Sequence, residues 1–317
     1  STTEVVSERK MTDFCVQEIG PSPFIPGFAL FDAHLGNSIV IRFARAGQGV
    51  PLLMVHGHPH NHVIWRKVAP TLAEHYTVIL PDLRGYGDSS KPVSDAEHTP
   101  YSKRVMARDL AQLMQGMGLT PFHYVGHDRG GRVGHRFALD APELFRTATF
   151  LDIAPTAVMY ERTNMEFARR YFWWFFLIQP EPLPEKMIDS DPEFFIHRHI
   201  DGQLKTPGAV SDEIMAEYLR CYKDPKMIHA VCEDYRASAG IDLKDDAADW
   251  QKLITCPLLL LWGAKGTVGK LYDVIETWHD RALSFEGQAL PCGHSPQEEV
   301  PELFLKTWTD FVAKHEK

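Results

Sequence analysis

The chain has 317 residues, of which 44% are hydrophobic and 24% are charged, a composition typical of a globular protein with a sizeable core. Its net charge is −9 and it contains no run of five or more lysines or arginines. A nucleic-acid partner is not expected, because neutralising phosphates needs clustered cations.

The predicted elements begin with residues 1–25, which lack strong periodicity and are expected to form an arm. A strand pair is expected near residue 30 and at Ser38–Ala44. After that, short apolar runs predict buried strands and helical spacing of apolar residues predicts helices. The strands are Pro51–Val55, Tyr76–Leu80, Phe122–Val125, Thr147–Ile153, Pro257–Trp262 and Ser284–Leu290; the helices are Tyr101–Met117, one ending near Leu139, and Leu303–Val312.

Strands that alternate with helices predict an α/β fold, with a mostly parallel sheet covered by helices on both faces. The interval from Pro155 to Asp249 interrupts this alternation, because it is rich in aromatic residues, prolines and charges and has helical patterning. We expect residues 155–249 to form a helical cap over the carboxyl ends of the strands, where open α/β folds bind ligands. Residues 1–154 and 250–317 are then expected to form the core domain.

The cysteines and the N-terminus bear on the compartment. Five cysteines are an odd number without a C-x-x-C pair, which favours free thiols in a reducing environment: Cys15, Cys221, Cys232, Cys256 and Cys292. The first twenty residues lack the apolar core of a signal peptide. The longest apolar run, Tyr171–Ile178, has eight residues, far fewer than the ~20 of a membrane helix. A cytoplasmic protein without a membrane partner is predicted.

The segment GHDRGG, Gly126–Gly131, follows a predicted strand and precedes a helix, which is the context of a nucleophile elbow. Small residues flank the central one because the turn is tight. Asp128 holds the position where serine is usual. An aspartate nucleophile forms an alkyl ester on its own side chain, which suits attack on an sp³ carbon that bears a leaving group. In isolation, Asp128 could equally be a helix N-cap.

A loop earlier in the chain favours the catalytic interpretation. His56-Gly57-His58-Pro59 follows an earlier strand at the position of an oxyanion loop, so the backbone N–H groups of His58 and Arg129 are expected to bind one oxygen of Asp128. The imidazoles of His56 and His58 are expected to be structural.

A general base is predicted at His294, which follows the last predicted strand and can take a proton from the water that attacks the ester. Its acidic partner is expected at Asp152, because the residues after the LLLLW strand include no carboxylate. Asp152 could alternatively serve as a cap or turn residue.

The segments GHDRGGRVGHRFALDAPE, LDIAPT, QPEPLPE, CEDYRASAGIDL and LPCGH occur in this order. Together they resemble the haloacetate dehalogenases, including the fluoroacetate dehalogenases, of the α/β-hydrolase superfamily. The similarity runs from roughly Phe24 to the C-terminus. By position, the resemblance implies that Asp128 is the nucleophile, Asp152 the acid and His294 the base.

The resemblance also implies that Arg129 and Arg132 bind the substrate carboxylate. These residues are spaced i, i+3 at the start of a helix and face the same way, so they can clamp a carboxylate and offset its repulsion from Asp128. A surface salt-bridge pair is the plainer alternative.

For the leaving halide, Trp174 and Tyr235 match the family's tryptophan and tyrosine, whereas Trp173 occupies the family's histidine position. An indole can donate a hydrogen bond but cannot become cationic, so chloro- or bromoacetate turnover is expected ahead of fluoroacetate turnover. The tryptophans could alternatively be plain core residues.

The predicted reaction converts a short 2-haloacid and water into a 2-hydroxy acid and halide, with no metal and no organic cofactor. An epoxide hydrolase is the nearest alternative; it needs two acids in the cap, and Tyr160 or Tyr171 could assist Tyr235. A non-catalytic binding module on a hydrolase scaffold is a third alternative. The resemblance also suggests a homodimer.

Overall fold

The computed structural model describes residues 13–316. In this part of the chain, nine strands form one sheet in the order β1-β2-β3-β5-β4-β6-β7-β8-β9. The first three strands pair antiparallel and β3 pairs antiparallel with β5, while β5, β4, β6, β7, β8 and β9 are all parallel. Their bounds are β1 (Cys15–Pro21), β2 (Ala29–His34), β3 (Val40–Ala46), β4 (Val50–Val55), β5 (Tyr76–Pro81), β6 (Phe122–His127), β7 (Phe145–Leu151), β8 (Leu258–Gly263) and β9 (Phe285–Leu290).

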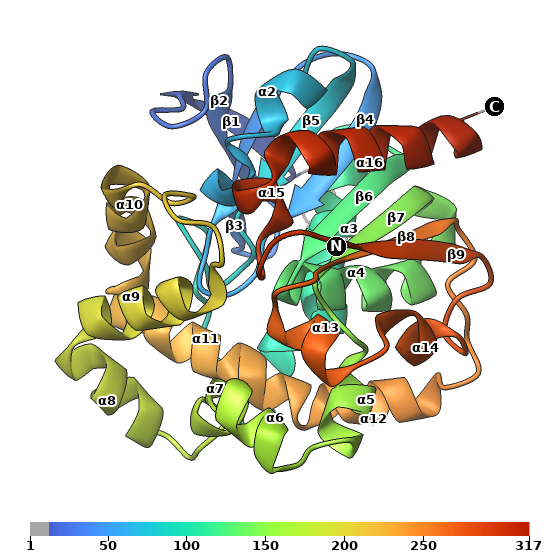
Figure 1. Ribbon diagram of the computed structural model, residues 1–317. Helices are drawn as coiled ribbons and strands as arrows, with labels where there is room; N and C mark the ends of the chain where they lie inside the picture. The colour runs from blue at the N-terminus through green and yellow to red at the C-terminus, as the bar shows by residue number, and fades with distance from the viewer. Residues whose placement is uncertain (1–12, 317) are drawn as a thin grey trace, which may run out of the picture.

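Helices cover both faces of the sheet and fill the interval between β7 and β8 (Figure 1). The core helices are α2 (Ala69–Leu72), α3 (Lys103–Gly116), α4 (Arg129–Asp140), α13 (Thr267–Leu271), α14 (Val274–Trp278), α15 (Pro296–Glu299) and α16 (Pro301–His315), with short 3₁₀ turns η1 (His62–Trp65), η2 (Thr99–Tyr101) and η3 (Pro142–Leu144). The interval forms α5 (Thr156–Glu161), α6 (Met165–Arg170), α7 (Trp173–Phe176), α8 (Leu183–Ser190), α9 (Pro192–Gln203), α10 (Asp212–Tyr222), α11 (Pro225–Ser238) and α12 (Ile241–Ala248). We call α5–α12 the cap helices.

The α/β-hydrolase fold expected from the sequence is confirmed, and each predicted strand and helix has a counterpart. The expectation of an arm over residues 1–25 is wrong for Cys15–Pro21, which is β1 and pairs with β2. Its side chains are nearly all exposed, so no apolar alternation marks it as a strand. Residues 1–12 lie outside the described part. The domain boundaries at 154/155 and 249/250 stay a prediction.

The sheet separates two apolar layers because alternate side chains of a strand point to opposite faces. In β6, Tyr124 packs in the cluster that includes α3, α4 and α14, while Val125 packs in the cluster that includes α16. Parallel strands in the centre are buried on both faces, which is why they read as continuous apolar runs. This arrangement brings the carboxyl ends of β4, β6, β7 and β8 to one edge.

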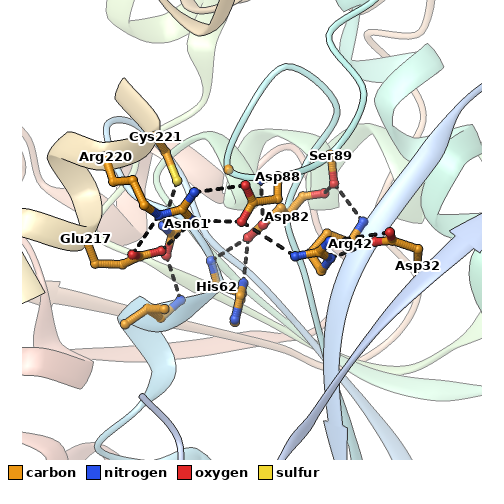
Figure 2. Close-up of polar contacts among 12 residues, drawn as sticks. Asp32, Arg42, Asn61, His62, Asp82, Asp88, Ser89, Glu217, Arg220 and Cys221 are labelled. Carbon is orange, nitrogen blue, oxygen red and sulfur yellow. Dashed lines mark hydrogen bonds and ion pairs between the residues drawn. The ribbon is translucent and has the colours of Figure 1, made fainter. Parts of the chain in front are cut away.

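Polar contacts fix the cap helices to the loop after β5. Arg220 of α10 points at Asp88, with N–O distances of 3.1 and 2.7 Å (Figure 2). In the same loop, Asp82 accepts hydrogen bonds from the backbone and the ring of His62, both at 2.8 Å. Exposed pairs such as Arg220–Asp88 add little stability, so this contact shows where α10 meets the loop after β5 and is not a main source of stability.

Candidate active site

Asp128 stands at a sharp turn between β6 and α4. Its backbone has φ 55° and ψ −119°, a conformation that non-glycine residues rarely adopt and that marks functional sites. The neighbouring backbone is packed so closely that a Cβ on Gly130 would lie 2.1 Å from the carbonyl oxygen of Val55. The predicted elbow geometry is therefore present, and the Asp128 side chain stays 15% exposed, open to a ligand.

The loop after β4 supplies a hydrogen bond to Asp128. The backbone N–H of His58 donates to Oδ1 of Asp128 at 2.9 Å. Gly57 permits this approach, because a Cβ there would lie 2.5 Å from the backbone nitrogen of Arg129. No hydrogen bond joins the Arg129 N–H to Asp128 within residues 13–316, so the oxyanion role of that N–H stays a prediction.

Asp152 and His294 meet beside Asp128. Asp152 follows β7, and its Oδ2 lies 2.5 Å from Nδ1 of His294, while its Oδ1 accepts from the N–H of Gly263 at 2.9 Å. The opposite ring nitrogen, Nε2, lies 3.4 Å from Oδ2 of Asp128. The structure thus brings together the three residues predicted from separate parts of the sequence, in the order carboxylate, imidazole, carboxylate.

The loop that carries His294 is held from two sides. Nε2 of His127 lies 2.8 Å from the carbonyl oxygen of His294 and can donate to it, and the backbone N–H of His294 donates to the carbonyl of Gln203 at 3.1 Å. Because Gln203 ends α9, the position of the imidazole depends on a cap helix as well as on the core.

The two carboxylates and the imidazole set one another's ionisation. Burial alone would raise the pKa of Asp128, but the hydrogen bond and charge of His294 hold it well below its usual range. Burial would lower the pKa of His294, but its bonds to Asp128 and Asp152 raise it to about 10. The two groups thus favour a negatively charged Asp128 beside a positively charged His294.

Arg129 is buried and already paired. Its Nη2 lies 2.8 Å from Oδ1 of Asp234 on α11, and its guanidinium lies 4.0 Å above the ring of Tyr235. Lys103 contacts the same aspartate at 2.5 Å. Within the described residues, Nη1 of Arg129 has no hydrogen-bond partner. One face of the guanidinium is thus fixed by the cap, and one nitrogen is available.

Arg132 is also buried but lacks a carboxylate partner within residues 13–316. Its Nη1 donates to the carbonyl of Ala154 at 2.8 Å and to the hydroxyl of Thr156 at 3.0 Å. Its Nε has no partner in the described part of the chain. Burial and the charge of Arg129 lower the pKa of Arg132. A buried cation with free N–H groups favours an anionic ligand.

Aromatic side chains of the cap surround the arginines. The guanidinium of Arg132 lies 4.7 Å from the ring of Trp174, whose ring is 6.3 Å from that of Tyr235 and 5.1 Å from that of Tyr160. The hydroxyl of Tyr160 is buried without a partner among residues 13–316. Trp174 and Tyr235 thus stand next to the predicted carboxylate site.

Trp173 packs against a histidine of the cap. Its ring contacts that of His199 on α9 with centroids 4.4 Å apart, and the His199 ring lies 4.7 Å from that of His58. The imidazole of His58 contacts the hydroxyl of Tyr222 at 2.8 Å, in agreement with its predicted structural role.

Comparisons with known proteins agree with this geometry. Residues 50–301 match the family model described as the alpha/beta hydrolase fold. This chain belongs to the α/β-hydrolase fold family. It is 41% identical to a fluoroacetate dehalogenase from Burkholderia over 87% of this chain and 91% of the relative. The resemblance to haloacetate dehalogenases is therefore confirmed.

Two other relatives of this hydrolase carry different descriptions. A soluble epoxide hydrolase from Corynebacterium is 32% identical over 87% of this chain and 95% of its own length. A crystal structure from Salmonella enterica, provisionally described as an acyltransferase, has 62% identity and a TM-score of 0.94 and covers 94% of this chain and 99% of its own. Hydrolase activity on the shared fold is supported, and the substrate must be argued from the site.

Three residues at the site of this hydrolase were missed by sequence reasoning: Asp234, His199 and Tyr222. Asp234 precedes Tyr235 in a segment that the resemblance includes, so its neighbour was a signal. His199 and Tyr222 lie on helices whose packing cannot be predicted from the spacing of residues in the sequence.

All five cysteines, which lie in the described part, are free thiols. In residues 13–316, no helix has the length and apolar character needed to cross a bilayer.

Proposed function

We propose that this hydrolase removes halide from short 2-haloacids and releases the 2-hydroxy acid. Arg129 and Arg132 would hold the substrate carboxylate, Asp128 would displace the halide, and His294 with Asp152 would activate water. Trp174 and Tyr235 are the proposed donors to the leaving halide. A role for Trp173 as a third donor remains part of the prediction, although its closest described ring neighbour is His199.

The observation that carries this proposal is the buried guanidinium of Arg132, whose Nε is unpartnered and which has no carboxylate partner within residues 13–316. A substrate carboxylate would supply the missing counter-charge and accept from the free N–H groups of Arg132 and Arg129. The same anion would then lie next to Asp128, at the start of α4, where the helix N-terminus also favours negative charge.

In the first step, a carboxylate oxygen of Asp128 attacks C2 of the acid and the carbon–halogen bond breaks with its electron pair on the halide. The product is an alkyl ester of Asp128 and a free halide ion. The indole N–H of Trp174 and the hydroxyl of Tyr235 make no hydrogen bond within the described residues, so both are free to donate to halide. The hydrogen bond from His58 would orient the attacking carboxylate.

In the second step, loss of negative charge on Asp128 changes His294. One of the two carboxylates that raise the imidazole pKa becomes a neutral ester, so this pKa falls and the imidazolium gives its proton to solvent, which is the one proton that the overall reaction releases. Neutral His294 then takes a proton from water as the water oxygen attacks the ester carbonyl, and the imidazolium is stabilised by Asp152. The bond between the carbonyl carbon and the alkyl oxygen then breaks, and the imidazolium protonates the departing alkoxide to give the 2-hydroxy acid. The new carboxyl group of Asp128 loses its proton to His294, which restores the starting pair of carboxylate and imidazolium.

This charge change predicts a pH dependence that differs between the two steps. Alkylation should persist at acidic pH because Asp128 stays ionised, whereas ester hydrolysis should slow about tenfold for each pH unit below the pKa of His294 in the ester form. Rapid-quench measurement at pH 5 should show a burst of one halide for each active site, followed by slow release. Equal loss of burst and steady-state rate would contradict the order of steps.

Arg132→Met is predicted to lower the activity without lowering the stability of the fold. Removing the carboxylate clamp should lower kcat/KM for chloroacetate by about two to three orders of magnitude. Removing a buried, uncompensated charge should leave the melting temperature unchanged or higher. The control is Arg136→Met one turn later, which breaks a 2.5 Å pair with Asp249. It should lower stability with little effect on kcat/KM; the same pattern for both variants would argue against a substrate role for Arg132.

An epoxide hydrolase is the second candidate. The Corynebacterium relative favours it, as do the rings of Tyr160 and Tyr235, which lie 5.1 and 6.3 Å from that of Trp174. Halide release from fluoro-, chloro- and bromoacetate and 2-chloropropionate, measured beside diol formation from styrene oxide, distinguishes the two. We expect halide release with chloro- or bromoacetate ahead of fluoroacetate, and little diol. Diol formation with no halide release would select the epoxide hydrolase.

Four further expectations from the sequence remain proposals. We retain a cytoplasmic location, a helical cap over residues 155–249, a homodimer, and a mechanism without metal or organic cofactor. A non-catalytic binding module stays an alternative that absence of turnover with every haloacid and epoxide would favour.

A further inference from the structure

A cleft of about 700 Å³ opens between the cap helices α6–α7 and α8–α9, a size typical of small-molecule sites. Aromatic and aliphatic side chains form much of its wall. Three of them are strongly exposed for their type, with Phe172 at 50%, Met187 at 56% and Phe194 at 67%. Exposed apolar side chains that gather on one surface mark a binding site more often than chance.

The cleft is also cationic, although the chain as a whole has a net charge of −9. Arg169, Arg170 and Arg198 line it. Arg170 pairs with Glu166 at 3.2 Å, whereas Arg169 and Arg198 have no carboxylate within 4.0 Å in the described part of the chain. The cleft's one carboxylate, Asp191, accepts from the N–H of Phe194 at 3.0 Å and caps α9. Positive charge around an apolar cleft attracts anions from solution.

The floor of the cleft adjoins the catalytic residues. Trp173 and His199 line it and contact each other, and His199 contacts His58, whose N–H binds Asp128 at 2.9 Å. Gln203 lines it too, and its carbonyl accepts from the N–H of His294. His58 alone therefore lies between the cleft-lining His199 and Asp128, and the cleft-lining Gln203 contacts His294 directly. Trp173 and His199 are both nearly buried and stand where the cleft approaches these residues.

We propose that this cleft is the vestibule through which substrate reaches Asp128, and that its apolar wall extends the proposed substrate range from haloacetates to 2-haloacids that carry an apolar substituent. The proposal rests on the proposed function. Arg169 and Arg198 would attract the carboxylate, the phenyl rings and Met187 would hold the apolar part, and the Trp173–His199 pair would move aside to admit the acid to Arg129 and Arg132. This role would also account for the packing of Trp173 against His199, which a role as halide donor alone does not explain.

Binding can be tested without catalysis. The probe is 8-anilinonaphthalene-1-sulfonate, an apolar anion whose fluorescence reports binding, and its uncharged counterpart is N-phenyl-1-naphthylamine. In the full chain, Arg169→Gln/Arg198→Gln should weaken binding of the anion about fivefold to tenfold at low salt and leave binding of the neutral probe unchanged. Phe194→Gln should weaken binding of both. The matched control, Arg108→Gln/Arg146→Gln, removes two exposed arginines outside the cleft and should change neither.

Kinetics supply the second readout. The Arg169→Gln/Arg198→Gln variant should lower kcat/KM for 2-bromohexanoate severalfold with kcat retained, and should reduce its dependence on salt. Equal weakening of the anion in the control variant, or unchanged binding in the cleft variant, would overturn the vestibule and leave the proposed dehalogenation intact. Selective probe binding without any halide release would contradict the proposed function alone.

Discussion

Asp128→Asn should lower the rate of halide release by about four orders of magnitude or more, the scale observed when a covalent nucleophile is removed. An amide oxygen is a much poorer nucleophile than a carboxylate oxygen. The side-chain shape and the hydrogen bond from His58 are kept, so the fold should survive. Halide release from chloroacetate and thermal unfolding measure the two effects.

Slow deamidation could restore the acid, so the Asn variant must be assayed fresh and its mass followed. Activity that rises in step with the mass change would support Asp128 as the nucleophile. Asp140→Asn is a suitable control, because Asp140 ends α4 and pairs with Arg104 and Arg136 away from the nucleophile. Full activity in freshly prepared Asp128→Asn would remove the basis of the mechanism.

His294→Ala should stop the reaction after its first half. Asp128 can still be alkylated, but no base remains to activate water, so one carboxymethyl group should accumulate for each active site. Hydrolysis of that ester should slow by about 10⁴-fold or more. Intact mass and peptide mapping after exposure to chloroacetate should locate the group on Asp128.

Thiol alkylation is the main source of a false adduct, since Cys15 is exposed. Chloroacetate is the reagent of choice because it reacts more slowly with thiols than bromoacetate does. The double variant Asp128→Asn/His294→Ala is the matched control and should carry no carboxymethyl group on the elbow peptide. A modified His294→Ala chain with the group on a cysteine alone would contradict the covalent mechanism.

The positions of the strands and of the candidate catalytic carboxylates could be predicted because each has a local signal. Buried parallel strands give continuous apolar runs, and GHDRGG combines small residues with an acid where β6 turns into α4. Asp152 and His294 follow strands β7 and β9, and the fold brings the carboxyl ends of strands together. The turn at Asp128, the loop after β4 and the position of His294 could therefore be predicted from their places relative to the strands.

Other features depend on contacts that no spacing encodes. β1 has exposed side chains and is a strand only because its backbone pairs with β2. The ion pair of Arg129 with Asp234 joins residues that are 105 positions apart. It shows that the two arginines differ, one being compensated by the cap and the other lacking a described carboxylate partner. The placement of Trp173 against His199 likewise follows from how α7 and α9 pack.

A single turnover in H₂¹⁸O tests the covalent mechanism most directly. With enzyme in excess over chloroacetate, the hydroxyl oxygen of the released hydroxy acid should come from the carboxylate of Asp128, so the acid should contain no label. The label should appear in the carboxylate of Asp128, where the elbow peptide should gain one ¹⁸O. Labelled hydroxy acid with an unlabelled Asp128 would mean that water attacks the substrate carbon itself, and the proposed ester would be excluded.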